Sequence, residues 1–131
     1  MITAAPPPVL EVYYSPTCAP CRLELPAIAE FVRDGETHVR IVILDQAKRA
    51  SEELREVSPI LAATAIVAKD ANPRTALRAA GDAEEMLPYA RVIAPGGQVC
   101  AQWRGSLTLS RARNLVAACV KTISAPNKRR S

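Results

Sequence analysis

The chain has 131 residues, enough for one domain with a buried core, and 49% of them are hydrophobic while only 4% are aromatic. Its formal net charge is +4, and three of these charges come from Lys128, Arg129 and Arg130 at the C-terminus. We therefore interpret residues 125–131 as a basic tail and expect no nucleic-acid partner, because the basic residues are not interleaved with aromatic ones.

Residues 1–8 are interpreted as a Pro-rich linker or tail. The alanine and proline run at positions 4–8 favours a stiff, extended spacer. This stretch has neither the charged start nor the apolar segment of a signal peptide, and the sequence contains no run of eighteen apolar residues. A membrane anchor or signal peptide that once preceded the spacer is compatible with these features.

The first predicted unit is a strand followed by a helix. Residues 9–14 (VLEVYY) are rich in β-forming residues and precede a Ser-Pro turn signal. From Pro20 onward, apolar residues recur at helical spacing as far as an Asp-Gly stop signal at positions 34–35. Two cysteines, Cys18 and Cys21, therefore lie between the end of a strand and the start of a helix.

The second predicted unit completes a βαβ arrangement. Residues 38–44 are apolar enough for a strand in the middle of a sheet. We expect Asp45 or Ser51 to cap a helix that runs to about residue 57. The crossover between the two strands should be right-handed.

The connector over residues 58–86 shows the least regular pattern. Residues 65–68 predict a short strand, and Asn72-Pro73 predicts the start of a helix that runs towards an Ala-Gly pair at positions 80–81.

A hairpin and a helix complete the predicted domain, which spans residues 9–124. Residues 89–94 and 98–103 are β-rich and are joined by a Pro-Gly-Gly turn, and residues 109–123 carry an apolar stripe at helical spacing. The predicted fold class is α/β, with a mixed central sheet in βαβ then ββα order.

The chemistry of the sequence centres on Cys18-Ala19-Pro20-Cys21. A sulfur at the start of a helix faces unpaired N–H groups and the positive end of the helix dipole, which favour a thiolate. Cys18 is therefore the predicted nucleophile. Cys21, one turn later and on the buried side, is the predicted resolving thiol. Pro20 suits the first helical turn because it lacks an N–H group.

Other uses of a CxxC motif remain open from the residues alone. Half of a zinc site, a purely structural disulfide and a metal-transfer site all use this spacing. A closed zinc site needs about four ligands, and Cys100, Cys119 and His38 offer neither a second CxxC nor an HxxxH spacing, so we expect no metal site.

The element order, with a CxxC motif at the first strand-to-helix junction, resembles the thioredoxin fold over residues 9–123. The features that carry this resemblance are the turn YSPTCAPCR, Pro26 five residues after Cys21, the Leu87-Pro88-Tyr89 segment and Gly105. It implies a three-layer fold, a kinked first helix and a cis peptide bond before Pro88, with the Leu87 backbone presented beside Cys18. The candidate substrate-binding residues are Thr17, Pro20, Leu87 and Pro88.

The spacing from Pro88 to the Pro-Gly-Gly turn is most similar to the TlpA-like branch. The residues that follow the two cysteines, Arg22, Glu24 and Pro26, share this similarity. This similarity implies a thiol-disulfide oxidoreductase that reduces disulfides of specific partner proteins and has no cofactor beyond its own cysteine pair. It implies a periplasmic or other extracytoplasmic location, with a membrane tether in the full-length protein and a membrane thiol reductase as electron donor. A cytoplasmic location is the alternative.

Two positions depart from the thioredoxin pattern. Thr17 replaces the tryptophan that usually precedes the first cysteine, and Val12 replaces a buried acid. These departures favour, as alternatives, a docking or metal-transfer module without redox turnover. An oxidant that donates its disulfide is a further alternative, although Ala19-Pro20 lacks the histidine that accompanies oxidants in the family.

Cys100 and Cys119 fall on the predicted last strand and last helix. We expect both to be buried thiols that pack as small hydrophobic groups. A second disulfide is the alternative, and it would favour an oxidising compartment.

Overall fold

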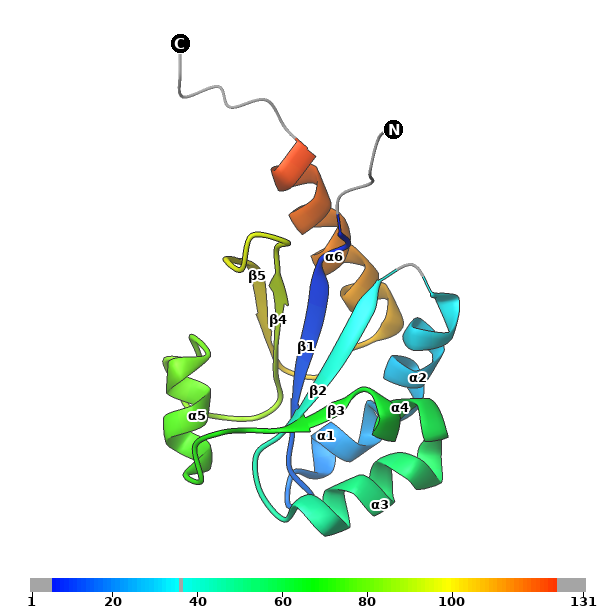
Figure 1. Cartoon of the computed structure of the whole chain (residues 1–131), viewed down its shortest axis with the longest axis vertical. Helices are drawn as coiled ribbons and strands as arrows, with labels where there is room; N and C mark the ends of the chain where they lie inside the picture. The colour runs from blue at the N-terminus through cyan, green and yellow to red at the C-terminus, as the bar shows by residue number, and fades with distance from the viewer. Residues whose placement is uncertain (1–5, 36, 125–131) are drawn as a thin grey trace.

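The structure is a computed structural model that describes residues 6–35 and 37–124 (Figure 1). The predicted basic tail lies outside the described residues, as do residues 1–5 of the Pro-rich segment. Within the described residues, the strands are β1 (Val9–Tyr14), β2 (His38–Ile43), β3 (Ala65–Val67), β4 (Tyr89–Ile93) and β5 (Val99–Arg104). The helices of the same ranges are α1 (Ala19–Leu23), α2 (Leu25–Asp34), α3 (Ala47–Val57), α4 (Pro59–Ala63), α5 (Pro73–Ala79) and α6 (Leu109–Ser124).

The described strands form one mixed sheet in the order β3-β2-β1-β4-β5. Strands β1, β2 and β3 are parallel, whereas β4 runs antiparallel to β1 and β5 antiparallel to β4. The predicted βαβ then ββα order is therefore confirmed. The hairpin between β4 and β5 turns through Gly97, whose φ of 97° is favourable for glycine.

Helices cover both faces of this sheet and produce three layers (Figure 1). Leu10, Val12 and Tyr14 of β1 point into the larger core, which α2, α3, α4 and α6 cover. Tyr13 points to the opposite face, where Leu77 of α5 packs against it in a smaller core. This alternation follows from the two-residue period of a strand.

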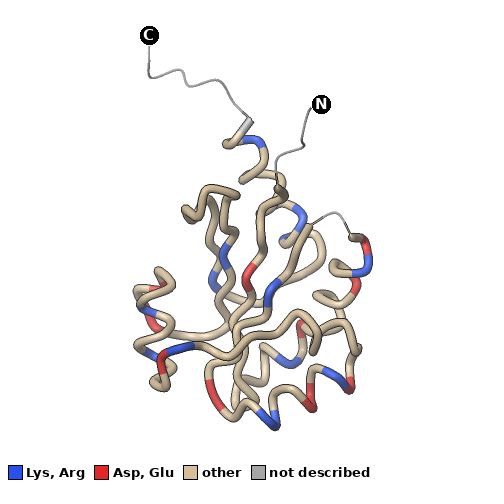
Figure 2. Tube along the Cα trace, viewed as in Figure 1, with Lys and Arg blue, Asp and Glu red and all other residues tan. Residues whose placement is uncertain are grey.

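The sheet face that carries the smaller core also carries an ion-pair cluster around Glu11. Figure 2 shows an acidic position on β1 between basic positions on the neighbouring strands β2 and β4. Arg40 and Arg91 donate to the Glu11 carboxylate at 2.6 and 2.7 Å, and Tyr13 donates to it at 2.9 Å. Burial alone would raise the pKa of Glu11, but these hydrogen bonds outweigh it and lower that pKa. Glu11 therefore faces away from the larger core that contains its neighbour Val12.

The predicted first helix is broken at Glu24, where α1 ends and α2 begins. Pro26 explains the break, because it has no N–H group to donate and its ring excludes the carbonyl four residues earlier. The kink that the resemblance implies is therefore present.

One expectation for the middle of the chain is wrong, and one short helix there was not predicted. Neither Asp45 nor Ser51 caps α3: Gln46 precedes the helix in a left-handed conformation without a side-chain cap, and Ser51 lies inside the helix. The short helix α4 was not predicted, because its five residues are too few for a periodic apolar pattern.

Over residues 6–35 and 37–124, every helix is too short or too polar to cross a membrane.

Candidate active site

The two cysteines lie where β1 passes into α1, as predicted. A tight turn joins them to the strand, and the Cys18 N–H donates to the Ser15 carbonyl at 3.0 Å. Pro16 occupies the second position of this turn, where its fixed φ is favourable. The turn places Cys18 at the N-cap of α1.

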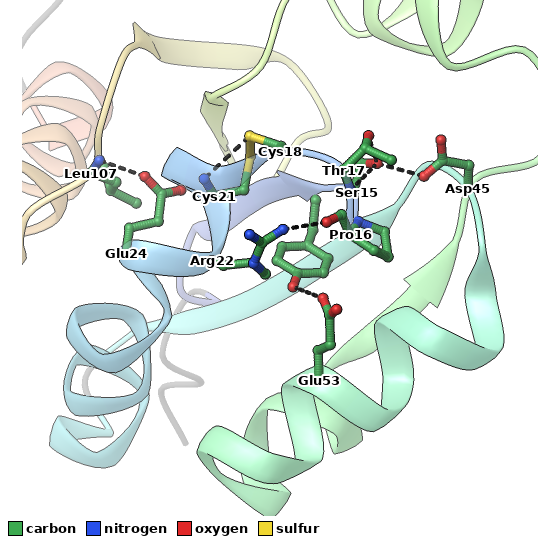
Figure 3. Close-up of a disulfide and its surroundings, with 11 residues drawn as sticks. Ser15, Pro16, Thr17, Cys18, Cys21, Arg22, Glu24, Asp45, Glu53 and Leu107 are labelled. Atoms are coloured by element: carbon green, nitrogen blue, oxygen red, sulfur yellow. Dashed lines mark hydrogen bonds between the residues drawn. A yellow bond between two sulfur atoms is a disulfide. The ribbon is translucent and has the colours of Figure 1, made fainter.

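Cys18 and Cys21 form a disulfide, with their Cα atoms 5.2 Å apart. Cys18 is partly exposed, whereas Cys21 is buried. The Cys21 N–H also donates to the Cys18 sulfur at 3.2 Å (Figure 3). An N–H group aimed at a sulfur stabilises negative charge on it, so this geometry supports Cys18 as the attacking atom and Cys21 as the resolving one.

A groove of about 500 Å³ lies beside Cys18. Thr17, Pro20 and Leu87, three of the predicted substrate-binding residues, line it together with Cys18. The Leu87-Pro88 peptide bond is cis, as the resemblance implied. Pro88, the fourth predicted substrate-binding residue, is not among the residues that line the groove. Its carbonyl accepts the Gly105 N–H at 3.0 Å.

The segment before Pro88 is anchored by the fully buried carboxylate of Asp82. Arg104 of β5 donates to this carboxylate at 2.7 Å. The backbone N–H groups of Glu84 and Met86 donate to it at 3.2 and 2.9 Å. Asp82 thereby holds the loop that presents Leu87.

Glu85 fixes the same loop from the side of α5. Its carboxylate accepts from Arg74 and Arg78, at 3.0 and 2.5 Å. Its φ of 55° is unusual for a residue with a Cβ atom, and its N–H donates to the Asp82 carbonyl at 3.1 Å. Arg74 and Glu85 consequently form one wall of the groove.

A buried acid, Glu24, lies behind Cys21. Glu24 is 6% exposed, and its carboxylate accepts a hydrogen bond from the Leu107 N–H at 2.7 Å (Figure 3). Burial raises the pKa of Glu24 to about 7, although the bond from Leu107 acts in the opposite direction. The site therefore contains a carboxyl group that can exchange a proton near neutral pH.

Side chains from other elements hold the active-site turn in place (Figure 3). Ser15 donates to the Asp45 carboxylate at 2.6 Å, which joins the turn to the end of β2. Arg22 donates to the Pro16 carbonyl, and Tyr14 at the end of β1 donates to Glu53 of α3.

Three acids of the site were not predicted as functional residues. Glu24 could have been found, because an acid three residues after Cys21 falls on the otherwise apolar, buried face of the predicted helix. The sequence offers Asp45 only as one of two candidates for a helix cap, beside Ser51. Asp82 lies in the connector, where the sequence shows no periodicity that would mark it as buried.

Cys100 of β5 and Cys119 of α6 also form a disulfide. The expectation of two buried thiols is wrong, and the disulfide alternative is confirmed. The reason is the packing of α6 on β5, which brings the two Cα atoms to 5.3 Å, within the range that a disulfide bridges.

Within the part of the chain that the structure describes, no three His, Cys, Asp or Glu side chains gather closely enough to hold a metal ion.

No protein-family model matches the sequence, and no curated protein matches it. Solved structures do resemble this one. A thioredoxin-related protein from Neisseria meningitidis serogroup B has a TM-score of 0.71 at 20% identity, over 91% of this chain and 89% of that one. A putative thiol:disulfide interchange protein DsbE from Chlorobium tepidum has a TM-score of 0.66 at 20% identity, over 88% and 82%. StoA from Bacillus subtilis has a TM-score of 0.61 at 14% identity, over 86% and 84%. These similarities confirm the thioredoxin-like fold.

Proposed function

We propose that this protein is a thiol-disulfide oxidoreductase that reduces disulfides of specific partner proteins. The observation that carries the proposal is the Cys18–Cys21 disulfide at the start of α1, with Cys18 open to a groove and Cys21 buried behind it. The similar DsbE and thioredoxin-related structures support the same chemistry.

The reaction starts from the dithiol form. The Cys18 thiolate attacks one sulfur of the partner disulfide, forms a mixed disulfide and releases the other partner sulfur as a thiolate that takes up a proton. Cys21 then loses its proton and attacks the Cys18 sulfur, which releases the second partner thiol. The protein dithiol loses two electrons and two protons, and the partner disulfide gains them.

Glu24 is the proposed proton acceptor for Cys21. The two residues are one helical turn apart, and both are buried on the same side of α1 (Figure 3). A carboxyl group with a pKa of about 7 is partly ionised at neutral pH, so it can accept the thiol proton. Glu24 would thus replace the buried acid that Val12 does not provide.

Leu87 is the proposed docking point for the partner chain. Among the described residues, its backbone N–H and carbonyl form no hydrogen bond, and its side chain lines the groove that contains Cys18. An extended partner segment could pair with this backbone as a strand would. Thr17 and Pro20 would contact the same segment.

We place the protein in the periplasm or another extracytoplasmic compartment. The Cys100–Cys119 disulfide supports this proposal, because disulfides persist in oxidising surroundings. Its oxidised cysteine pair would be reduced again by a donor dithiol, such as that of a membrane thiol reductase. The Cys18–Cys21 pair itself serves as the redox group, without a further cofactor.

The test is turnover of a protein disulfide. Reduced wild-type protein should reduce the interchain disulfides of insulin, and Cys18→Ser should abolish this activity. The Cys18–Cys21 pair should also equilibrate with glutathione at a reducing potential. A strongly oxidising potential would instead indicate a disulfide donor, and stoichiometric metal uptake without turnover would indicate a metal-transfer module.

A further inference from the structure

Asp45 lies beside the active-site turn without a role in the reaction proposed above. It comes two residues after the end of β2, and the parallel pairing of β1 with β2 continues to this point, where the Leu44 N–H donates to the Tyr14 carbonyl at 2.9 Å. The Asp45 carboxylate accepts a hydrogen bond from the Ser15 hydroxyl, with 2.6 Å between the two oxygens (Figure 3).

Ser15 transmits this contact to the turn that carries Cys18. Its side-chain oxygen accepts the Thr17 N–H at 3.2 Å, and its carbonyl accepts the Cys18 N–H at 3.0 Å. A serine hydroxyl has one proton to donate, and here Ser15 donates it in the hydrogen bond to Asp45. The Thr17 hydroxyl, 2.9 Å from the Ser15 oxygen, must therefore donate to Ser15. Asp45 thus sets the direction of every hydrogen bond at the Ser15 side chain.

The Asp45 charge faces the same groove as Cys18. Within residues 6–35 and 37–124, no cation forms an ion pair with Asp45, and Ser15 is its hydrogen-bond partner. Because no cation neutralises this carboxylate, it repels a second negative charge in the same groove.

The other charged groups near Cys18 are already engaged. Arg22 on α1 donates to the Pro16 carbonyl, and Glu24 at the other end of α1 accepts from the Leu107 backbone. Arg74 of α5 is paired with Glu85 on the far wall of the groove. Removing the Asp45 charge would therefore leave no cation without its partner near Cys18.

We propose that Asp45 is a positioning residue for Cys18: through Ser15 it holds the active-site turn, and its carboxylate opposes negative charge on the Cys18 sulfur. The second effect keeps the attacking thiol less acidic, and a less acidic thiol is the stronger nucleophile once ionised. It also disfavours the reduced, thiolate form of the pair. This inference rests on the proposed redox use of Cys18.

The test is the pH profile of Cys18 alkylation by iodoacetamide in a Cys21→Ser background, which needs no partner protein. Its result is therefore independent of whether insulin is reduced. Asp45→Asn removes the charge but retains an oxygen that accepts from Ser15. We expect the midpoint of the profile to fall by about 0.3 to 0.6 pH unit, and the limiting rate at high pH to fall by no more than about twofold.

Ser15→Ala tests the hydrogen bonds of Ser15 separately from the charge of Asp45. It keeps the Asp45 carboxylate but releases the turn, so the limiting alkylation rate should fall about threefold to tenfold while the midpoint stays within about 0.2 unit. Glu30→Gln is the matched control. It removes an exposed carboxylate of α2 that forms no hydrogen bond or ion pair among the described residues, and it should leave both quantities unchanged.

Thermal unfolding should confirm that each variant is folded, and Asp45→Ser replaces Asp45→Asn if the latter fails. An unchanged or raised midpoint in the charge-removing variant would overturn the electrostatic part of the proposal. A parental limiting rate in Ser15→Ala would overturn the positioning part.

Discussion

The carboxylate of Glu24 accepts a 2.7 Å hydrogen bond from the backbone N–H of Leu107, 83 residues further along the chain. This bond joins the break between α1 and α2 to the segment that leads into α6. It also holds an acid in a buried position behind Cys21. The bond therefore links the position of the proposed proton acceptor to the packing of the last helix.

The first prediction concerns stability and the titration of Glu24. Its pKa rises from 4.5 in the unfolded chain to about 7 in the folded protein, so the folded state binds more protons between these values. The free energy of unfolding should therefore fall as pH rises from about 4.5 to 7, by up to about 3 kcal/mol from this group. Urea denaturation of the oxidised protein across this range measures the effect.

Glu24→Gln should remove this part of the pH dependence, because glutamine stays neutral. The same variant should slow the resolving attack of Cys21 at pH 7, while the alkylation rate of Cys18 stays close to wild type. If Glu24→Gln keeps the full loss of stability between pH 4.5 and 7, the raised pKa is not responsible for it.

Local signals in the sequence explain why the strands and most helices could be predicted. Residues 9–14 combine β-forming residues with a turn signal, and Asn72-Pro73 combines a cap with a proline in the first helical turn. The dithiol could be placed because it lies between two such elements. These features depend on neighbours within a few residues.

The rest of the site depends on contacts between distant parts of the chain. Asp45 had a plausible local role as a helix cap, but its actual partner, Ser15, is 30 residues away. Asp82 lies in a connector without periodicity and is paired with Arg104, 22 residues away. The bond between Cys100 and Cys119 likewise depends on how α6 packs against β5. No local pattern identifies these partners.

The second prediction concerns the Asp82 anchor. Asp82→Ala should release the loop that presents Leu87, because two backbone N–H groups and Arg104 lose their acceptor. We expect a loss of about 1 to 3 kcal/mol in stability. The KM for insulin should rise at least threefold, while the reaction with a small disulfide such as glutathione disulfide stays within about twofold.

Glu84→Gln is the control for this loop, because Glu84 is exposed and lies 3.8 Å from Arg104. It should leave both substrates unaffected. Equal losses with insulin and with glutathione disulfide in Asp82→Ala would contradict a role in docking.

The third prediction concerns the second disulfide. Replacing both Cys100 and Cys119 with alanine opens a cross-link between residues 19 positions apart, which should lower the free energy of unfolding by about 3 kcal/mol. Insulin reduction per folded molecule should stay within about twofold of wild type, because this disulfide lies outside the groove beside Cys18. Chemical denaturation and turnover are measured on the same preparation. Loss of activity in a fully folded double variant would show that the second pair takes part in the reaction.

The most direct test of the central claim is the capture of a mixed disulfide. Cys21→Ser keeps the partly exposed nucleophile Cys18 and removes the thiol that resolves the intermediate. It should therefore accumulate a covalent complex with a disulfide-containing protein such as insulin, joined through Cys18. Mass spectrometry of the complex identifies the linked cysteine, and a reducing agent should release the partner. A linkage through Cys100 or Cys119, or equal capture by Cys18→Ser, would contradict the account.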